Sequence, residues 1–323
     1  MIQKKNFAIG IDIGGTNTKF GIVDHRGDTL YRGVIASNKY EKIEPYLDEL
    51  YEALEPAIKE VGGIEAIKGI GIGAPNGNFY NGTIEYAPNL KWKGIIPLAK
   101  LISEKFKVPA ALTNDANAAA VGEMMYGAAR GMKDFIMITL GTGVGSGIVA
   151  NGQLILGHDG FAGELGHTII VPGGRMHWST GHKGSLEAYA SATGLTMTAI
   201  EFLEQRPKEK SLLRNYNKED IDSRVVFECA MKGDQIARDV YAFTGKILGE
   251  ALANFVMFSS PEAIILFGGL TKAGDLIMKP VKEHMEKNLL PIFQNKVQLV
   301  FSELNEADAA ILGASALVWE MKG

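Results

Sequence analysis

The sequence has a single cysteine, Cys229, among its 323 residues. One cysteine cannot form a disulfide within the chain, which fits a reducing cytoplasm and excludes the disulfide-rich secreted class. Cys229 lies in the apolar segment RVVFECAMK. We therefore expect a buried helix thiol rather than a nucleophile.

The sequence also lacks long apolar runs and a basic excess. No segment approaches the ~20 apolar residues of a membrane helix, and the N-terminal stretch reaches Asp12 before any apolar run of signal-peptide length. The 33 Lys and Arg against 37 Asp and Glu give a formal charge of −4, which offers no basic surface for nucleic acid. We expect a cytoplasmic protein without membrane or nucleic-acid partners, and no helix-turn-helix before the first strand.

Glycine, in contrast, is abundant, with 39 residues concentrated near expected strand ends. The usual content is ~7%. Such a distribution indicates ligand-binding turns rather than linkers.

One stretch of the chain occurs twice. Residues 10–30 read GIDIGGTNTKFGIVDHRGDTL, and residues 138–155 read ITLGTGVGSGIVANGQLI. Gly15 and Gly141 lie 126 positions apart (141 − 15), and the tripeptide GIV recurs at the same offset. The pattern predicts a duplicated unit of strand, glycine turn, strand, polar turn and strand.

The repeated glycine turn is suited to binding phosphate. Without a Cβ the backbone can adopt positive φ and bring several N–H groups close to an anion, and a Thr hydroxyl adds a donor. Two such turns could hold one polyphosphate from both sides, and Asp12 could hold a hydrated Mg²⁺. The alternative is that each turn is a hairpin chosen for its shape. The duplication and Asp12 favour the phosphate interpretation.

Strands and helices alternate along the chain, which predicts an α/β fold. Apolar residues recur at helical spacing in 41–61 and 234–258. Short buried-type strands are expected in 66–77, where the strand stops in a Gly-Ala-Pro turn, and in 261–270. The remaining predictions are helices at 97–106, 186–203 and 306–320, a strand running into a helix at 108–129, an irregular segment at 172–185 and a charged connector at 208–224.

Seven motifs occur in order: DIGGTNTKFGIVD (12–24), GIGAPNG (71–77), TNDANAAAVGE (113–123), LGTGVGSGIV (140–149), GELGH (163–167), GSLEAYAS (184–191) and FGGL (267–270). With these motifs the chain resembles a sugar kinase of the ROK family, within the actin/hexokinase/Hsp70 superfamily, over nearly its whole length.

The resemblance implies two ribonuclease-H-like (actin-like ATPase) α/β domains with a ligand cleft between them. We expect a small domain over 1–112, rejoined by the C-terminal helix 305–323, and a large domain over 113–304.

The resemblance also implies site residues, which fall into three groups. The phosphate and nucleotide group is Asp12, Gly14, Gly15, Thr16, Gly141, Thr142, Gly143, Gly268 and Gly269, with Asp12 near Mg²⁺ through water. The sugar group is Gly73, Asn89, Asn114, Asp115, Glu164, His167 and Glu187. Asp115 matches the family's catalytic base.

The chemistry of phosphoryl transfer agrees with these roles, because the reaction needs backbone donors, Mg²⁺ and one carboxylate near the attacking hydroxyl. Thr113 or Asn114 can cap the helix that follows, which places Asp115 in its first turn. An isolated aspartate there most often complements the helix dipole, and Glu164 with His167 could be a solvated surface pair. The surrounding motifs favour the functional roles.

One departure from the family pattern concerns zinc. Most members carry a Cys-x-Cys-Gly-x-x-Gly-Cys-x-Glu segment that binds structural zinc, whereas Trp178, Thr180 and Ser185 stand at the cysteine positions here. Zinc would have to use His167, His177 and His182, and structural zinc sites favour cysteine. We therefore expect no zinc.

Without zinc, the order of residues 172–186 must come from elsewhere. We expect Trp178 and neighbouring apolar packing to replace the metal. His177 and His182 are interpreted as plain polar loop residues.

The resemblance implies ATP- and Mg²⁺-dependent phosphorylation of a hexose at its 6-hydroxyl. Glucose is the expected substrate, because GSLEAYAS resembles the glucokinase branch. The nearest alternatives are an N-acetylglucosamine or N-acetylmannosamine kinase, and polyphosphate as donor. A sugar-responsive transcriptional repressor is a hypothesis from another class, and it would require a DNA-binding domain. A non-catalytic sugar-binding regulator is a third hypothesis, and it would be expected to lack Asp12 or Asp115. The resemblance favours a homodimer.

Overall fold

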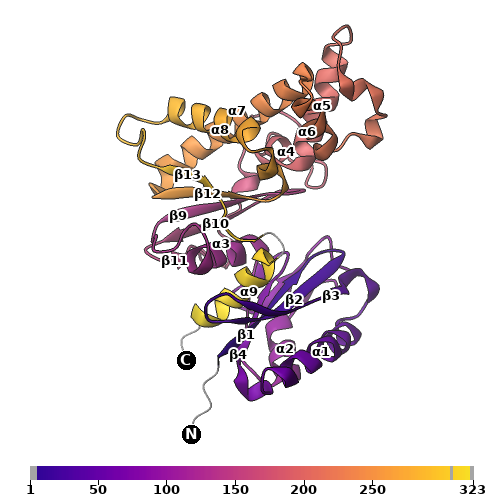
Figure 1. Ribbon diagram of the computed structural model, residues 1–323, viewed down its shortest axis with the longest axis vertical. Coiled ribbons are helices and arrows are strands. Elements are labelled where there is room, and N and C mark those ends of the chain that lie inside the picture. Colours follow the sequence, from indigo (N-terminus) through magenta and orange to yellow (C-terminus); the bar gives the residue numbers. More distant parts are fainter. Residues whose placement is uncertain (1–5, 306–307, 321–323) are drawn as a thin grey trace. The chain divides into compact units, whose positions relative to one another are not determined.

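The computed structural model describes residues 6–305 and 308–320 (Figure 1). Its contacts divide the chain into two compact units. Unit 1 comprises the described parts of Met1–Lys133, Gly147–Gly163 and Ser302–Gly323, and unit 2 comprises Asp134–Ser146 and Glu164–Phe301. The predicted α/β class is confirmed.

The first sheet has five strands in the order β3-β2-β1-β4-β8. Strands β1, β2 and β3 pair antiparallel, and β1, β4 and β8 pair in parallel. The bounds are β1 Phe7–Ile13, β2 Asn17–Asp24, β3 Thr29–Ala36, β4 Ile67–Gly73 and β8 Ala110–Thr113.

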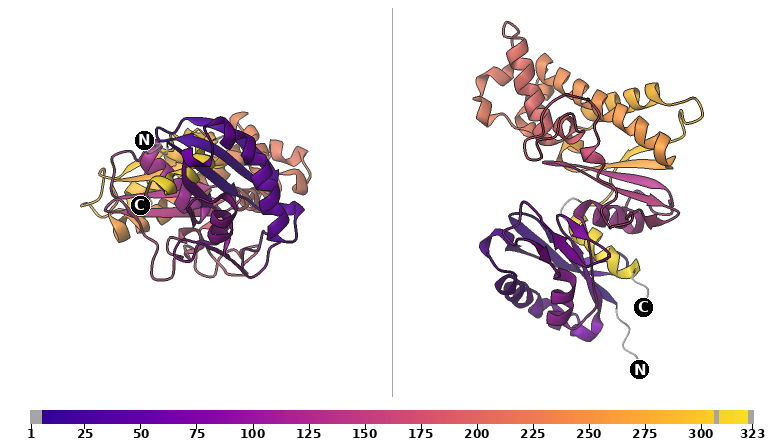
Figure 2. Two further views of the ribbon diagram at one scale, coloured as in Figure 1. Left: turned by 90° about the horizontal axis from the view of Figure 1, so that it is seen from below. Right: turned by 180° about the vertical axis from the view of Figure 1, so that it is seen from behind.

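Helices cover both faces of this sheet (Figures 1 and 2). Helices α1 (Ile43–Glu60) and α2 (Leu98–Phe106) share one apolar core with Ile9 and Ile11 of β1. Side chains alternate along a strand, so Gly10 faces the other side. There α9 (Ala309–Glu320) approaches so closely that a Cβ on Gly10 or Gly71 would collide with helix carbonyl oxygens. Both glycines are therefore required by packing.

The remaining elements of unit 1 include a short three-stranded sheet and helix α3. The bounds are β5 Gly77–Asn78, β6 Thr83–Glu85, β7 Ile95–Ile96 and α3 Asp115–Tyr126.

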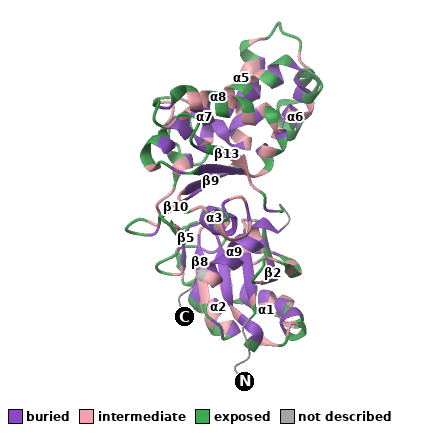
Figure 3. Cartoon of the chain, turned by 60° about the vertical axis from the view of Figure 1, so that its left-hand side comes forward, coloured by how far each residue is buried: buried purple, intermediate pink, exposed green. Residues whose placement is uncertain are grey.

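The second five-stranded sheet repeats the topology of the first, in the order β11-β10-β9-β12-β13. Strands β9, β12 and β13 are parallel, and β10 with β11 forms the antiparallel hairpin. The bounds are β9 Phe135–Leu140, β10 Val144–Ala150, β11 Gln153–Leu154, β12 Ala263–Phe267 and β13 Gln298–Phe301. The internal repeat therefore corresponds to two copies of one sheet, and buried residues make up most of both (Figure 3).

Unit 2 is completed by five helices. The bounds are α4 Glu187–Ala190, α5 Ala192–Gln205, α6 Ser223–Met231, α7 Gln235–Ser259 and α8 Asp275–Asn288.

Most predicted elements are confirmed, including α1, α2, α7 and strand β12. The predicted helix 186–203 is broken at Ser191, whose hydroxyl accepts the N–H of Gly194 and caps α5. Helix α6 begins inside the predicted charged connector 208–224. The predicted helix 306–320 is seen from Ala309, and residues 306–307 lie outside the described residues.

The contact division differs from the predicted boundary at residue 112. It groups α3 with the first sheet and passes through β10, while the described residues from Ser302 onward belong to unit 1. The predicted division at residues 112 and 304 stays a prediction. Within residues 6–305 and 308–320, no helix has both the length and the apolar character needed to cross a membrane.

Candidate functional site

Two predicted site residues, Asp12 and Gly73, lie side by side with Thr113 at the carboxyl edge of the first sheet. Asp12 of β1 is in register with Gly73 of β4, and Gly73 is in register with Thr113 of β8. Asn114 and Asp115 follow directly. The carboxyl ends of parallel strands in α/β proteins are where ligands usually bind, so the register assembles the acidic part of the candidate site.

Gly73 leaves open the space between the Asp12 carboxylate and the backbone of Asp115. A Cβ at this position would lie 3.7 Å from Asp12 Oδ1, 3.6 Å from Asp115 Cα and 3.3 Å from the Ala118 methyl group. Any side chain longer than a methyl group would therefore fill the gap beside Asp12.

Asp12 is held in an electrostatically unfavourable place. It is partly buried, and desolvation together with the neighbouring Asp115 carboxylate raises its pKa to about 6, against a smaller opposing effect of Lys19. Lys19 is its cross-strand partner on β2. A carboxylate kept in such surroundings is typical of functional sites.

Asp115 is the first residue of α3 and combines an accessible carboxylate with desolvating surroundings. Its side chain is exposed, yet the protein around it displaces enough bulk water to raise its pKa, while the backbone N–H of Ala116 opposes the shift. That N–H donates to Oδ1 at 2.8 Å. A ligand hydroxyl could therefore reach the carboxylate while the rest of its environment stays dry.

Asn114 is the N-cap of α3, as one of the two predicted capping options. Its Oδ1 accepts the N–H of Asn117 at 2.6 Å. The cap fixes the start of the helix and with it the position of Asp115. The side-chain amide of Asn114 is the part that could contact a sugar.

The first glycine turn is shaped by close approach rather than by unusual dihedral angles. Gly14 and Gly15 do not have positive φ. A Cβ on Gly15 would lie 2.9 Å from the carbonyl oxygen of Asn89, so this glycine allows Asn89 to lie against the turn. The predicted sugar residue Asn89 is thereby placed next to the predicted phosphate loop, whose Thr16 is exposed.

The second glycine turn receives a carboxylate from elsewhere in unit 2. Glu187, at the start of α4, accepts the N–H of Val144 through Oε2 at 2.6 Å. A Cβ on Gly143 would collide with the same oxygen. This turn therefore binds Glu187 with one N–H, and in the described residues the N–H groups of Thr142 and Gly143 have no hydrogen-bond acceptor.

A cavity of about 510 Å³ lies next to this turn. The turn after β12 packs against Leu140, the last residue of β9. A Cβ on Gly268 would lie 2.6 Å from the Leu140 carbonyl oxygen, and Gly268 has a φ of 106°, so this position requires glycine. The lining includes the predicted residues Gly141, Thr142 and Gly269, together with Leu140, Ala192, Ser223, Arg224, Phe227, Glu228, Tyr241, Leu270, Lys272 and Ala273. No pattern in the sequence points to the α6 residues as part of a cavity, because 208–224 is predicted as a charged connector and the segment around Cys229 as a buried helix.

The GELGH segment packs directly on the second turn. A Cβ on Gly166 would collide with the Val144 carbonyl oxygen, and the N–H of Leu165 donates to Ser146 Oγ at 3.1 Å. This packing holds the exposed Glu164 and His167 at the ends of a short 3₁₀ turn, η3 Leu165–His167.

His177 is the residue that sequence reasoning missed. The interpretation of His177 as a plain loop residue is wrong, because its side chain is buried and its Nε2 lies 2.5 Å from Glu187 Oε1. His167, His177 and Glu187 form a cluster whose possible metal-binding atoms lie within 4.8 Å of one another. Both ring nitrogens of His177 are already hydrogen-bonded, so the cluster fits a metal poorly. The absence of zinc stays a prediction.

Arg175, rather than apolar packing around Trp178, is the main anchor of the 172–186 segment. Its guanidinium binds both carboxylate oxygens of Glu201, at 2.9 and 2.6 Å, and stacks on the Tyr189 ring. The same group donates to the carbonyl oxygens of Ala188 and Gly194. Trp178 is 43% exposed and contributes by stacking on His177. The expectation for this segment is corrected accordingly.

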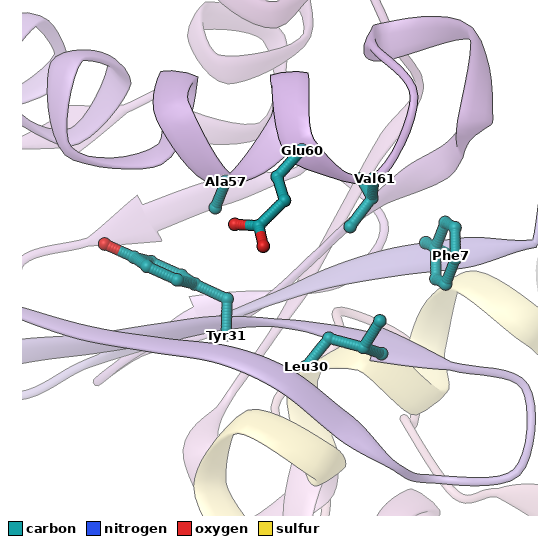
Figure 4. A pocket seen from close by; sticks show the side chains of 6 residues that line it. All are labelled: Phe7, Leu30, Tyr31, Ala57, Glu60 and Val61. Atoms are coloured by element: carbon teal, nitrogen blue, oxygen red, sulfur yellow. The ribbon is translucent and has the colours of Figure 1, made fainter.

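Another hollow of about 500 Å³ lies between β1, β3 and the end of α1. It is lined by Phe7, Leu30, Tyr31, Ala57, Glu60 and Val61, with the Glu60 carboxylate among apolar side chains (Figure 4). Tyr31 donates its hydroxyl to the Ala53 carbonyl. None of these residues belongs to the predicted site.

The predicted residues thus form one group in each unit. Unit 1 holds the acidic group with the first turn, and unit 2 holds the second turn, the cavity and the Glu164, His167 and Glu187 side chains.

Comparison with known proteins finds glucokinases that resemble this chain over nearly its whole length. The chain is 37% identical to a glucokinase of Halalkalibacterium halodurans over 316 residues, which cover 96% of this chain and 94% of the relative. It is 32% identical to a glucokinase of Thermotoga maritima, with 98% of each chain covered. A glucokinase of Streptomyces griseus, solved with glucose and AMPPNP, matches with a TM-score of 0.80 and 31% identity over 98% of this chain and 100% of that chain. The model of the ROK family matches residues 8–321, and the chain belongs to this family.

Proposed function

We propose that this protein transfers the γ-phosphoryl group of ATP to the 6-hydroxyl of glucose. The observation that carries the proposal is the register of Asp12, Gly73 and Thr113, which sets Asp115 and Asp12 at one sheet edge around an open glycine. The glucokinase relatives support glucose as substrate, and the neighbour solved with AMPPNP supports ATP as donor.

In this proposal Asp115 accepts the proton of the attacking hydroxyl. A base works best when its pKa lies near the working pH, and desolvation raises the pKa of Asp115 toward that range. Fixed by the Asn114 cap and the Ala116 N–H, the carboxylate would align the hydroxyl for transfer. Alignment is the main task of the protein in phosphoryl transfer.

Asp12 would hold Mg²⁺ in this proposal. The fit follows from its charge environment, because burial and Asp115 raise the pKa of Asp12 to about 6, and a divalent cation would stabilise the ionised form. Carboxylate oxygen is also a ligand type that Mg²⁺ prefers. When bound, Mg²⁺ neutralises negative charge on the transferring phosphates.

The second copy would hold the nucleotide and orient the sugar. The cavity beside Gly141, Thr142 and Gly269 has the size of a nucleoside site, and the N–H groups of Thr142 and Gly143 are suitable phosphate donors. Glu164, His167 and Glu187 supply acceptors and donors for sugar hydroxyls.

Further features of the proposal are a homodimer in the cytoplasm and a role in glycolysis. The single cysteine suits a reducing compartment, and the family resemblance suggests the dimer. Sedimentation of the purified chain would establish its oligomeric state.

The proposal is tested with a coupled ADP-release assay containing ATP and Mg²⁺. The sugars are glucose, mannose, fructose, N-acetylglucosamine and N-acetylmannosamine, and phosphorus NMR identifies the phosphorylated position. We expect turnover on glucose with glucose 6-phosphate as product. Faster turnover of an N-acetylated sugar would identify that sugar, rather than glucose, as the substrate. Sugar binding without turnover, with either ATP or polyphosphate as donor, would contradict the proposed kinase activity.

A further inference from the structure

His177 lies where a side chain can act on the sugar site without touching the sugar. It is in the irregular segment before α4, and its own side chain is 1% exposed although Thr180, Gly181 and His182 around it are exposed. Its backbone N–H donates to the His182 carbonyl oxygen at 2.8 Å. The ring is therefore held by the fold and faces Glu187.

The hydrogen bonds of the ring determine which nitrogen carries the proton. Nδ1 lies 3.2 Å from the backbone nitrogens of both Ser179 and Thr180. A backbone N–H can only donate, so Nδ1 is an acceptor and carries no hydrogen. The proton of the neutral ring must then be on Nε2, which donates it to Glu187 Oε1 across 2.5 Å.

Glu187 is consequently held through both carboxylate oxygens. His177 donates to Oε1, and the Val144 N–H donates to Oε2 at 2.6 Å. The Gly143 backbone lies directly under Oε2, because a Cβ there would collide with it. Each oxygen keeps a further lone pair for an incoming hydroxyl. The carboxylate is therefore preorganised before any ligand binds.

The ring of His177 is in turn fixed by an aromatic neighbour. Trp178 stacks on it with ring centroids 4.1 Å apart and planes inclined by 23°. The exposed His167 ring meets it edge-on at 5.7 Å. Rotation of the imidazole would break the Ser179, Thr180 and Glu187 hydrogen bonds together, so one orientation is strongly favoured.

We propose that His177 is a positioning residue that orients Glu187 for binding sugar hydroxyls through its Nε2–H. The inference rests on the proposed function for the sugar, but the His177–Glu187 hydrogen bond does not depend on it.

The first test compares two substitutions of His177 in the kinase assay. Glutamine can place an amide donor near the position of Nε2, whereas phenylalanine keeps a ring for Trp178 and removes the donor. We expect H177F to raise the KM for glucose about 10- to 100-fold, as for loss of a hydrogen bond to a charged group, with a smaller change in kcat and in the KM for ATP. H177Q is expected to recover most of the loss.

The control is H182F, since His182 lies in the same segment and is exposed. It is expected to leave the KM for glucose unchanged. An unchanged KM in H177F would overturn the proposal. Equal increases in the KM for glucose in H177F and H177Q, with the melting temperature of both unchanged, would also overturn it. Kinase activity that requires added Zn²⁺ would overturn it as well.

The second test needs neither activity nor a stable H177F variant. In ¹⁵N-histidine spectra of the unsubstituted protein, the signal missing from H177Q belongs to His177. It should show a hydrogen on Nε2 and none on Nδ1, and the reverse tautomer would contradict the assignment. If no sugar is phosphorylated, glucose affinity by calorimetry replaces KM, and the same order of variants is expected. Absence of glucose binding would overturn both the sugar role and the proposed function.

Discussion

The two copies of the repeated sheet have the same strand order but different chemistry. At the 126-residue offset, Asp12 of the first copy corresponds to Ile138 of the second, and Lys19 corresponds to Gly145. Ile138 is fully buried, whereas Asp12 has a pKa raised to about 6 by burial and by Asp115. The fold alone therefore does not require the charges, and their presence in one copy indicates a function there.

The second copy obtains a carboxylate from outside the repeat. Glu187 of α4 binds the Val144 N–H over Gly143, and the residue at the corresponding place in the first turn is Asn17. We interpret the difference as a division of tasks, in which the carboxylates at the edge of the first sheet act on the reacting groups and Glu187 at the second turn orients the sugar.

The largest effect is expected from Asp115→Asn, which removes the base from the first copy. We expect kcat to fall about 10²- to 10⁴-fold, the range for loss of a general base. The matched control is Asp275→Asn, because Asp275 is also the first residue of a helix but forms a surface ion pair with Lys279. Steady-state ADP release measures both. Equal decreases in kcat for the two substitutions would mean that Asp115 only complements the helix dipole and is not the base.

A smaller effect is expected from Gly143→Ala in the second copy. The new methyl group would displace Glu187, so glucose affinity by calorimetry should fall about 10- to 100-fold. Gly141→Ala is the control, because no atom lies within 4 Å of a Cβ there. If Gly143→Ala bound glucose as well as Gly141→Ala, the second turn would not position the sugar carboxylate.

Stability should respond to Asp12→Asn, which makes the first copy more like the second. The folded-state pKa of about 6 lies above the ordinary 3.8, so ionisation of Asp12 costs stability as pH rises between these values, and the full cost remains above pH 6. At pH 7 we expect Asp12→Asn to gain about 1–2 kcal/mol in unfolding free energy, allowing for partial exposure.

That gain should vanish near pH 4, where Asp12 is protonated in the folded protein, and urea unfolding at both pH values would measure it. The exposed Asp28→Asn serves as the control. A gain that does not depend on pH would mean that packing, rather than charge, determines the cost of Asp12.

The smallest effect is expected from metal removal in the segment that precedes Glu187. Arg175 and His177 satisfy its polar groups without a metal, so a strong chelator should leave the melting temperature unchanged. A drop of several degrees that Zn²⁺ reverses would show that this segment of the second copy depends on a metal.

The acidic part of the site could be predicted because its residues lie at the ends of patterned strands. The apolar runs before Asp12, Gly73 and Asp115 identify strand ends, and parallel pairing brings such ends to one edge. The sequence predicts the turn glycines, but not the close contacts that require two of them. Gly15 and Gly143 allow Asn89 and Glu187 to approach, and neither has positive φ.

The parts that could not be predicted depend on tertiary contacts without sequence periodicity. His177 is one polar residue in an irregular segment, and its role depends on burial against Glu187. Ser191 interrupts a run that reads as a continuous helix. Arg224 and Phe227 reach the cavity only because α6 packs near the turn after β12.

The most direct test of the division between the copies is the pair of kinetic constants for glucose in Asp115→Asn and Glu187→Gln. The account predicts that Asp115→Asn acts mainly on kcat and that Glu187→Gln acts mainly on the KM for glucose. If both variants changed the same constant, either kcat or the KM for glucose, by similar factors, the proposed division of tasks would be contradicted.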